Sequence, residues 1–239
     1  MFIFLRLLLA HLLADFALQT DYIYYLRVKF SWGVVFHSLV FAGLSVILLT
    51  PYLNEQRTWL LIAILWGSHT LLDKLKNNYI FSTGEDSIWW FLMDQVVHLI
   101  IIIGGCLVMN SMQPMTLPPF YQGIYHSDLF FRYANGYVFT LFVPVALVYY
   151  IEKTWWGQER DVLYPSPYLK YTGVFERLAV LSFLLAGKPY YFFVPLPLLF
   201  SWYLQRTGEE QEDFLYPKIV LSLITCLLTA HWLTSQLTT

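Results

Sequence analysis

Histidine and aspartate recur four residues apart inside hydrophobic stretches of the first half of the chain. The candidate residues are three such pairs and one further histidine: His11/Asp15, His69/Asp73, Asp94/His98 and His37. Residues four apart share one face of an α-helix. An imidazole and a carboxylate on one face can both bind a metal, or the carboxylate can hold the imidazole N–H. Because ionisable groups are costly in hydrocarbon, each of these residues is a candidate functional residue.

The side chains favour a divalent metal ion as the bound species. Imidazole nitrogen and carboxylate oxygen are ligands for zinc, with manganese or iron as alternatives. Cys106 and Cys226 lie far apart in apolar stretches, so we interpret them as packing residues. Four histidines and three aspartates exceed the needs of one tetrahedral ion, so the surplus makes either a two-metal site or a supporting layer. A bound metal lowers the pKa of its water to near 7, which suits hydrolysis of an ester or phosphoester.

Three further ionisable residues are candidate catalytic residues. Lys76 follows the His69/Asp73 pair and is placed to receive an anionic group. Glu176 and Arg177 open a later hydrophobic stretch, where neighbours in sequence cannot face each other on a helix. The Arg177 guanidinium suits a phosphate or a carboxylate. The alternative for this second group is a structural salt bridge that joins the two halves of the chain.

The composition predicts that these residues lie in an all-α integral membrane protein. Hydrophobic residues make up 58% of 239 and charged residues 13%, whereas soluble domains carry about a quarter charged residues. A membrane-spanning helix needs about 20 mostly apolar residues. We therefore predict about eight membrane helices (seven to eight), and the lipid bilayer is the first expected partner. The expected spans are 2–19, 32–50, 59–77, 88–109, 135–152, 173–187, 190–205 and 217–235.

The spans predict three regions. Residues 1–111 form a four-helix membrane module that carries the His/Asp site, and residues 112–134 form an extracytoplasmic loop with three prolines. Residues 135–239 form the C-terminal membrane helices, in which 173–187 and 190–205 are each barely long enough to cross. Breaks are expected at Thr50-Pro51 and at Asn77-Asn78. A net charge of −2 and the lack of any recognisable nucleic-acid module exclude nucleic acid as the expected partner.

The predicted loops also indicate orientation. Loops on one side carry nine Lys or Arg residues against three on the other, and the richer side is expected in the cytoplasm. With a rise of about 1.5 Å per residue, His11 and His69 then lie roughly 12 Å from the cytoplasmic face, and Asp15 and Asp73 roughly 6 Å. The other three candidates fall between about 9 and 15 Å. Helices of opposite direction thus place all seven in one layer, which predicts a single site.

Several functions remain open on the residues alone. The first is a metal-dependent hydrolase acting on a lipid or lipid-linked substrate at the cytoplasmic side of the membrane. The second is a cation or proton transporter or channel, although the outer halves of the first four spans are almost purely apolar. The third is a haem protein with histidine axial ligands. The three nearby carboxylates argue against it, because a haem pocket is mainly apolar. The fourth is a non-catalytic subunit whose polar layer only fixes helix packing.

The motifs resemble a bacterial inner-membrane family. They are LLAHLLADFALQTDYI (8–23), His37-Ser38, HTLLDKLK (69–76), DQVVH (94–98) and GVFERLAVL (173–181). In these the chain is similar to domain-of-unknown-function family 3307, and the likeness covers about the first half and the sixth span. The resemblance implies a multi-pass protein of the bacterial inner membrane. The His- and Asp-rich helices are also loosely similar to membrane-bound metal-dependent hydrolases of the DNA-damage-regulated type, which implies a hydrolase only by analogy.

The predicted orientation is testable with single cysteines. In a variant whose two native cysteines are replaced, Lys74→Cys should react only with a membrane-permeant thiol reagent in intact cells, because cytoplasmic loops carry the Lys/Arg excess. A cysteine at Arg57, on the opposite side, serves as the control and should react with an impermeant reagent. Labelling of Lys74→Cys by the impermeant reagent would contradict the common depth of the candidate residues.

Overall fold

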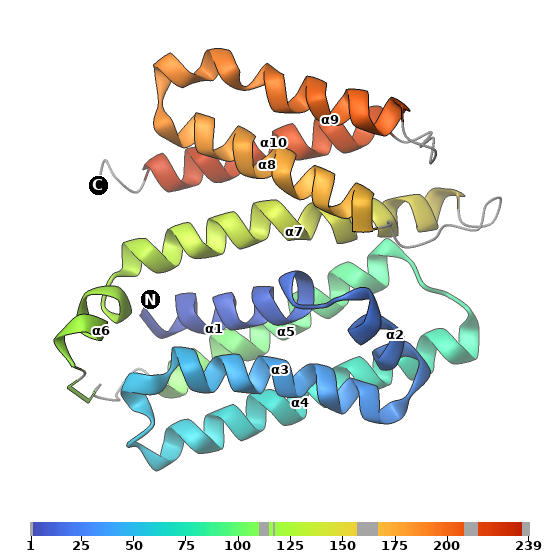
Figure 1. The fold of residues 1–239 in the computed structure, drawn as a ribbon. Coiled ribbons are helices and arrows are strands. Elements are labelled where there is room, and N and C mark those ends of the chain that lie inside the picture. The colour runs from blue at the N-terminus through green and yellow to red at the C-terminus, as the bar shows by residue number, and fades with distance from the viewer. Residues whose placement is uncertain (1, 110–114, 117, 157–166, 208–214, 236–239) are drawn as a thin grey trace. The chain divides into compact units, whose positions relative to one another are not determined.

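All described elements of the chain are helices. The computed structural model describes residues 2–109, 115–116, 118–156, 167–207 and 215–235 (Figure 1). The chain divides into two compact units, Met1–Asn135 and Gly136–Thr239, with the helix α7 running through the boundary. The all-α prediction is confirmed over the described ranges.

The first unit is built around four helices packed in a ring. Its elements are α1 (Phe2–Leu12), a π-helical turn (Leu13–Ala17), α2 (Asp21–Lys29), α3 (Ser31–Leu48), a 3-10 turn (Thr50–Tyr52), α4 (Gln56–Thr83), α5 (Ile88–Met109), α6 (Pro119–Tyr125) and the start of α7 (Asp128–Trp156). Helix α1 packs against α3 and α5, α3 packs against α4, and α4 packs against α5 (Figure 1). Leu7, Phe41, Leu65 and Ile102 fill the space between them. The four ring helices lie within residues 1–111, while the compact unit extends to Asn135, so the four-helix membrane module stays a prediction.

A sharp bend follows α1 and creates a helix that the hydrophobic pattern does not predict. The π-helical turn ends with a hydrogen bond from the Leu18 N–H to the Leu13 carbonyl at 2.8 Å. Thr20 then caps α2 by accepting a hydrogen bond from the Ile23 N–H at 3.3 Å. The α1 segment and α2 meet at 90°. Gly33 permits α2 to lie against α3, since a Cβ on it would approach the Leu26 carbonyl oxygen to 2.0 Å.

Helix α4 is longer than expected. The sequence places a break at Asn77-Asn78, but the helix continues to Thr83 and ends at Gly84, whose φ of 73° is in the left-handed region. Asn77 does not interrupt the helix because its side chain donates a hydrogen bond to the Arg27 carbonyl oxygen at 3.0 Å. The expected break is therefore wrong, and the glycine six residues later is the stop signal.

A buried arginine connects α1 to the segment that follows α5. Arg6 is fully buried, and its guanidinium donates a hydrogen bond to the Tyr125 carbonyl and faces Asp128 at 3.6 Å. The guanidinium carbon lies 4.0 Å from the centre of the Phe131 ring. Residues 112–134, expected as a loop, thus contain α6 and the start of α7, while 110–114 and 117 lie outside the described residues. Arg6 provides the polar and cation–π contacts that hold α6 and the start of α7 against α1.

The second unit contains three further helices. After the remainder of α7 come α8 (Pro167–Ala186), a 3-10 turn (Lys188–Phe193), α9 (Pro195–Thr207) and α10 (Leu215–Ser235). Helix α8 packs against both α9 and α10. Val180, Leu181, Cys226 and Ala230 form the core between α8 and α10. Cys226 is a fully buried free thiol, in agreement with a packing role.

Four of the described helices are long and apolar enough to cross a membrane by themselves. They cover Ser31–Leu48, Ile88–Leu107, Asp128–Trp155 and Pro217–Ser235, and the bent α1/α2 pair adds a fifth if it is counted as one span. Helix α9 has 13 residues, and α4 and α8 carry charged residues in their middle. These helices suggest a membrane protein, and a multi-pass arrangement with about eight spans stays a prediction.

The close approach of α2 to α3 gives a stability test. Gly33→Ala should destabilise the protein by about 1–3 kcal/mol, because the new Cβ overlaps the Leu26 backbone and pushes α2 away. Gly43→Ala is the matched control in the same helix, since a Cβ there meets nothing within 4 Å. Thermal unfolding in one detergent should show a lowered midpoint for Gly33→Ala only, and equal midpoints would contradict the packing described.

Candidate metal centre

The seven candidate His and Asp residues all lie inside the first unit and are all buried. His11 closes α1, and Asp15 lies in the π-helical turn that follows. His37 comes from α3, His69 and Asp73 from α4, and Asp94 and His98 from α5. None is more than 8% exposed. The structure brings together every residue of this predicted set, from four separate helical segments.

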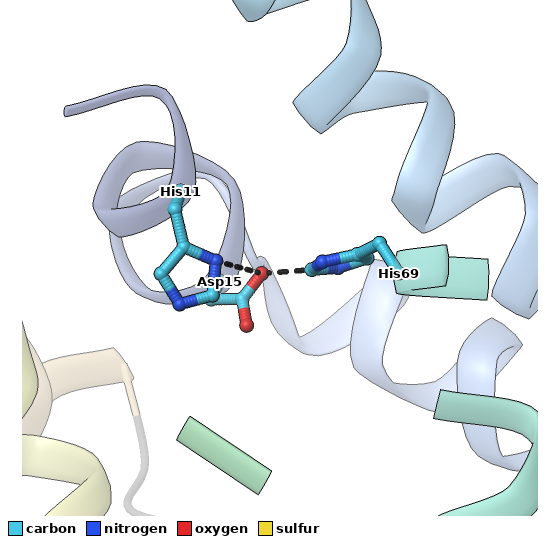
Figure 2. Close-up of side chains that lie close together, drawn as sticks. All are labelled: His11, Asp15 and His69. Carbon is cyan, nitrogen blue, oxygen red and sulfur yellow. Dashed lines mark ion pairs between the residues drawn. The ribbon is translucent and has the colours of Figure 1, made fainter. Parts of the chain in front are cut away.

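The π-helical turn has a particular role in placing Asp15. A π turn inserts an extra residue into the helical register and is often found at functional sites. Asp15 Oδ1 lies 3.8 Å from His11 Nδ1 and 3.3 Å from His69 Nε2, so the carboxylate points between the two rings (Figure 2). The four-residue spacing predicts the His11/Asp15 neighbourhood, but the hydrophobic pattern gives no signal for the π turn.

Four atoms converge at the centre of the cluster: Asp15 Oδ1, His37 Nε2, His69 Nε2 and Asp73 Oδ2. The two nitrogens are 3.5 Å apart. Asp15 Oδ1 is 3.4 Å from His37 Nε2 and 3.3 Å from His69 Nε2. Asp73 Oδ2 is 3.7 Å and 3.6 Å from the same two nitrogens. Five of the six pairwise distances among these atoms thus fall between 3.3 and 3.7 Å.

Each of these five distances is close to the separation of two ligand atoms that bind one metal ion. Ligand atoms bound tetrahedrally at about 2.0–2.2 Å lie roughly 3.3–3.6 Å from one another. The two carboxylate oxygens, Asp15 Oδ1 and Asp73 Oδ2, are buried and have no hydrogen-bond partner. A buried carboxylate oxygen without a donor is costly. The arrangement therefore fits a cation better than it fits a set of hydrogen bonds.

Arg27 is a site residue that is not among the residues predicted for the site; in the sequence it is one of the nine Lys and Arg residues of the expected cytoplasmic loops. Its Nη2 donates a hydrogen bond to Asp73 Oδ1 at 2.9 Å, and its Nη1 donates to Gln19 Oε1 at 3.3 Å. Arg27 is 8% exposed, and Asp73 is fully buried. The pair leaves Asp73 Oδ2 directed to the histidines while Oδ1 is neutralised. The signal available in the sequence was Thr20, a good helix N-cap residue, followed by a short stretch with Arg27 and Lys29 in its last turn.

Asp94 is held by a different group of donors. Lys76 Nζ donates to Asp94 Oδ2 at 3.1 Å, and Gln95 Nε2 donates to the same oxygen at 3.3 Å. Gln95 Oε1 in turn lies 3.2 Å from His11 Nε2. The His98 Nδ1 lies 2.8 Å from the Asp94 carbonyl oxygen. Lys76 therefore lies beside the cluster and pairs with one of its acidic side chains, while its role in receiving an anionic group stays a prediction.

Glu176 and Arg177 have their described contacts inside the second unit. The Arg177 Nη2 and Nε donate to the Leu141 carbonyl oxygen at 2.7 and 3.1 Å, and Nη1 donates to Ser222 Oγ at 3.2 Å. Pro144 lies within α7 and lacks the N–H that would bond the carbonyl four residues earlier, one residue before Leu141. The described contacts of Arg177 are hydrogen bonds inside the second unit, which suggests a structural role, while the salt bridge between the two halves and the binding of a substrate anion stay predictions.

Comparison with known proteins identifies a family for the first half of the chain. Residues 3–119 match the model of the family described as "Protein of unknown function (DUF3307)". The matched segment contains the four ring helices and all seven His and Asp residues. No curated protein and no solved structure matches the chain.

The contacts of Arg177 predict a structural effect. Arg177→Lys should lower the thermal midpoint of the detergent-solubilised protein, with a loss of about 1–3 kcal/mol, because an ammonium cannot serve the Leu141 carbonyl and Ser222 together. Arg206→Lys, at an exposed position on α9, is the matched control and should be neutral. A wild-type midpoint for Arg177→Lys would contradict the structural role.

Proposed function

We propose that this chain, whose residues 3–119 match the model of the DUF3307 family, is a membrane-embedded metal-dependent hydrolase. The proposed metal ligands are Asp15 Oδ1, His37 Nε2, His69 Nε2 and Asp73 Oδ2. The ion is a divalent metal, with zinc favoured over manganese or iron because imidazole nitrogen and carboxylate oxygen are common zinc ligands. The proposed substrate is a lipid or lipid-linked ester, reached from the cytoplasmic side.

The single observation that carries this proposal is the set of five ligand-to-ligand distances. Nothing in helix packing requires four polar atoms from the π turn, α3 and α4 to lie 3.3–3.7 Å apart. Two of the atoms are carboxylate oxygens without hydrogen bonds, a costly arrangement unless a cation binds both. A divalent ion offsets this cost and explains why the cluster is buried.

The charges of the cluster suit one metal ion. Three carboxylates (Asp15, Asp73 and Asp94) face two cations (Arg27 and Lys76), which leaves one net negative charge when the histidines are neutral. One divalent ion changes this to one net positive charge, which favours an anionic group near the metal. A second ion at Asp94 is disfavoured, because the Lys76 ammonium already holds Asp94 Oδ2. We therefore propose one ion, with Asp94, His98 and His11 as its supporting layer.

The outer faces of the ring helices support a lipid substrate. Leu60, Ile64, Leu71 and Leu75 follow one face of α4 and are each at least 55% exposed. Exposed apolar faces of this kind are expected where helices contact acyl chains. Arg27 and Lys76 lie on the side whose loops are rich in Lys and Arg, which is the reason for proposing access from the cytoplasm.

Metal analysis tests the proposal. Protein purified in detergent without histidine tags, or with the tag removed, should contain about one zinc, manganese or iron per chain by elemental analysis. His69→Ala and Asp73→Asn should each reduce this to near zero, because each removes one of the four proposed ligands. His126→Ala, an exposed histidine of the same unit, is the matched control and should retain the metal.

The outcomes separate the functions considered. Metal-free wild-type protein, prepared without chelators and not reconstituted by added zinc or manganese, would remove the support for a metal enzyme. An absorbance band of haem would favour the haem alternative instead. Stoichiometric metal that exchanges rapidly and accompanies cation flux in liposomes would favour a transporter.

A further inference from the structure

Helix α2 has a buried inner face and an exposed outer face. On the inner face Leu26 and Arg27 are buried, and Arg27 Nη2 donates a hydrogen bond to Asp73 Oδ1 at 2.9 Å. The outer face of α2 consists of four exposed residues: Tyr22, Tyr25, Val28 and Lys29. Three of these side chains are large and apolar or aromatic, and the fourth is a cation. The outer face therefore combines the two features that a membrane surface binds.

The aromatic surface continues from α2 onto α3. Phe30 and Trp32 are both exposed, and their rings stack with centroids 5.5 Å apart. Further along α3, Phe36 and Leu39 are also exposed. Helix α3 begins two residues after α2 ends, and it is one of the helices long and apolar enough to cross a membrane. The outer face of α2 thus adjoins the end of a candidate span, where a span meets the headgroup layer.

The direction and level of α2 fit a membrane surface. The α1 segment meets α2 at 90°, so α2 lies in the membrane plane when α1 runs along the membrane normal. Asn77 of α4 is level with α2, because its side chain donates a hydrogen bond to the Arg27 carbonyl oxygen at 3.0 Å. Two residues further on, the ring of Tyr79 lies 4.2 Å from that of Trp90. Tyr and Trp side chains are enriched at membrane–water interfaces.

Lys29 gives this surface a positive charge. Its Nζ donates a hydrogen bond to Tyr25 Oη, and it lies 4.9 Å and 5.7 Å from the ring centres of Tyr25 and Phe30. Within the part of the chain that the structure describes, no carboxylate pairs with Lys29. A lysine whose stem and ammonium lie among aromatic rings at a membrane surface is suited to a phospholipid phosphate.

We propose that α2 lies in the headgroup layer of the membrane, with its outer face docked on anionic phospholipid whose phosphate binds Lys29. The aromatic side chains suit the boundary between headgroups and acyl chains, and the cation suits a negatively charged headgroup. Because Arg27 projects from the inner face of the same helix, the docking also holds Arg27 against Asp73 from the membrane side. The docking requires no bound ion, so it goes beyond the proposed hydrolase activity.

Depth measurements test the docking. In a variant whose two native cysteines are replaced, single nitroxide labels are attached at Tyr22→Cys and at Val28→Cys, and the protein is reconstituted into vesicles of phosphatidylcholine and phosphatidylglycerol. Power-saturation electron paramagnetic resonance with oxygen and a water-soluble nickel chelate then gives the depth of each label. Both labels should lie in the headgroup layer at equal depth, whereas a helix along the membrane normal would separate them by roughly 9 Å.

A label at Leu39→Cys, on the exposed face of α3, is the hydrocarbon reference and should be deeper than both. A Tyr22 label as accessible to the nickel chelate as a label in free solution would overturn the docking, because α2 would then project into water. Two labels at unequal depths in hydrocarbon would overturn it as well, because α1 and α2 would then form one bent span.

Lipid preference tests the role of Lys29. A bimane fluorophore at Val28→Cys is quenched by brominated phosphatidylglycerol or by brominated phosphatidylcholine, and the ratio of the two gives the preference at low ionic strength. The preference for phosphatidylglycerol should be roughly five-fold, the effect of one basic side chain at an anionic surface. Lys29→Gln should abolish it. Lys74→Gln, at an exposed lysine of α4, is the matched control and should retain it. A preference unchanged in Lys29→Gln would overturn the proposal.

Discussion

The structure of the first unit depends on the burial of carboxylate charge in an apolar helical ring. Asp73 is fully buried, and burial of an isolated carboxylate costs much free energy. Arg27 from α2 and His37 from α3 offset part of this cost. The π turn brings a second carboxylate, Asp15, against the same histidine, which adds to the charge that must be neutralised. The arrangement of the helices is therefore tied to the requirements of a few polar atoms.

The local irregularities of the chain follow from this requirement. A regular continuation of α1 would carry residues 18–29 away along the helix axis, whereas the 90° bend returns α2 beside α3. Gly33 allows the backbones of α2 and α3 to approach closely enough for Arg27 to reach Asp73. The π turn redirects Asp15 within the same short stretch. Strain-prone backbone features thus concentrate where the site is built.

The His/Asp set could be predicted from the sequence because its members obey helical spacing. His69/Asp73 and Asp94/His98 lie one turn apart on regular helices, so their shared face follows from periodicity alone. Arg27 could not be found in this way, since its helix is short and joins the site through a bend that periodicity does not encode. Gln95 is recognisable in the sequence as a polar residue in an apolar helix. Its contacts with His11 and Asp94 join two helices, however, and the sequence does not show which residues it contacts. Arg177 was noticed for its charge, while its partner is a backbone carbonyl near Pro144, which residue types do not reveal.

The four central atoms come from residues in one early part of the chain, and this has a consequence for biogenesis. All of them come from the stretch between Asp15 and Asp73, which leaves the ribosome before α5 has been made. Helices that are inserted one after another associate when packing and polar contacts between them stabilise the association. The segment from α1 to α4 carries all four central atoms before α5 is made. We therefore expect α1, α3 and α4 to associate with one another first. Helix α5, with Asp94 and His98, then closes a structure whose centre is already defined.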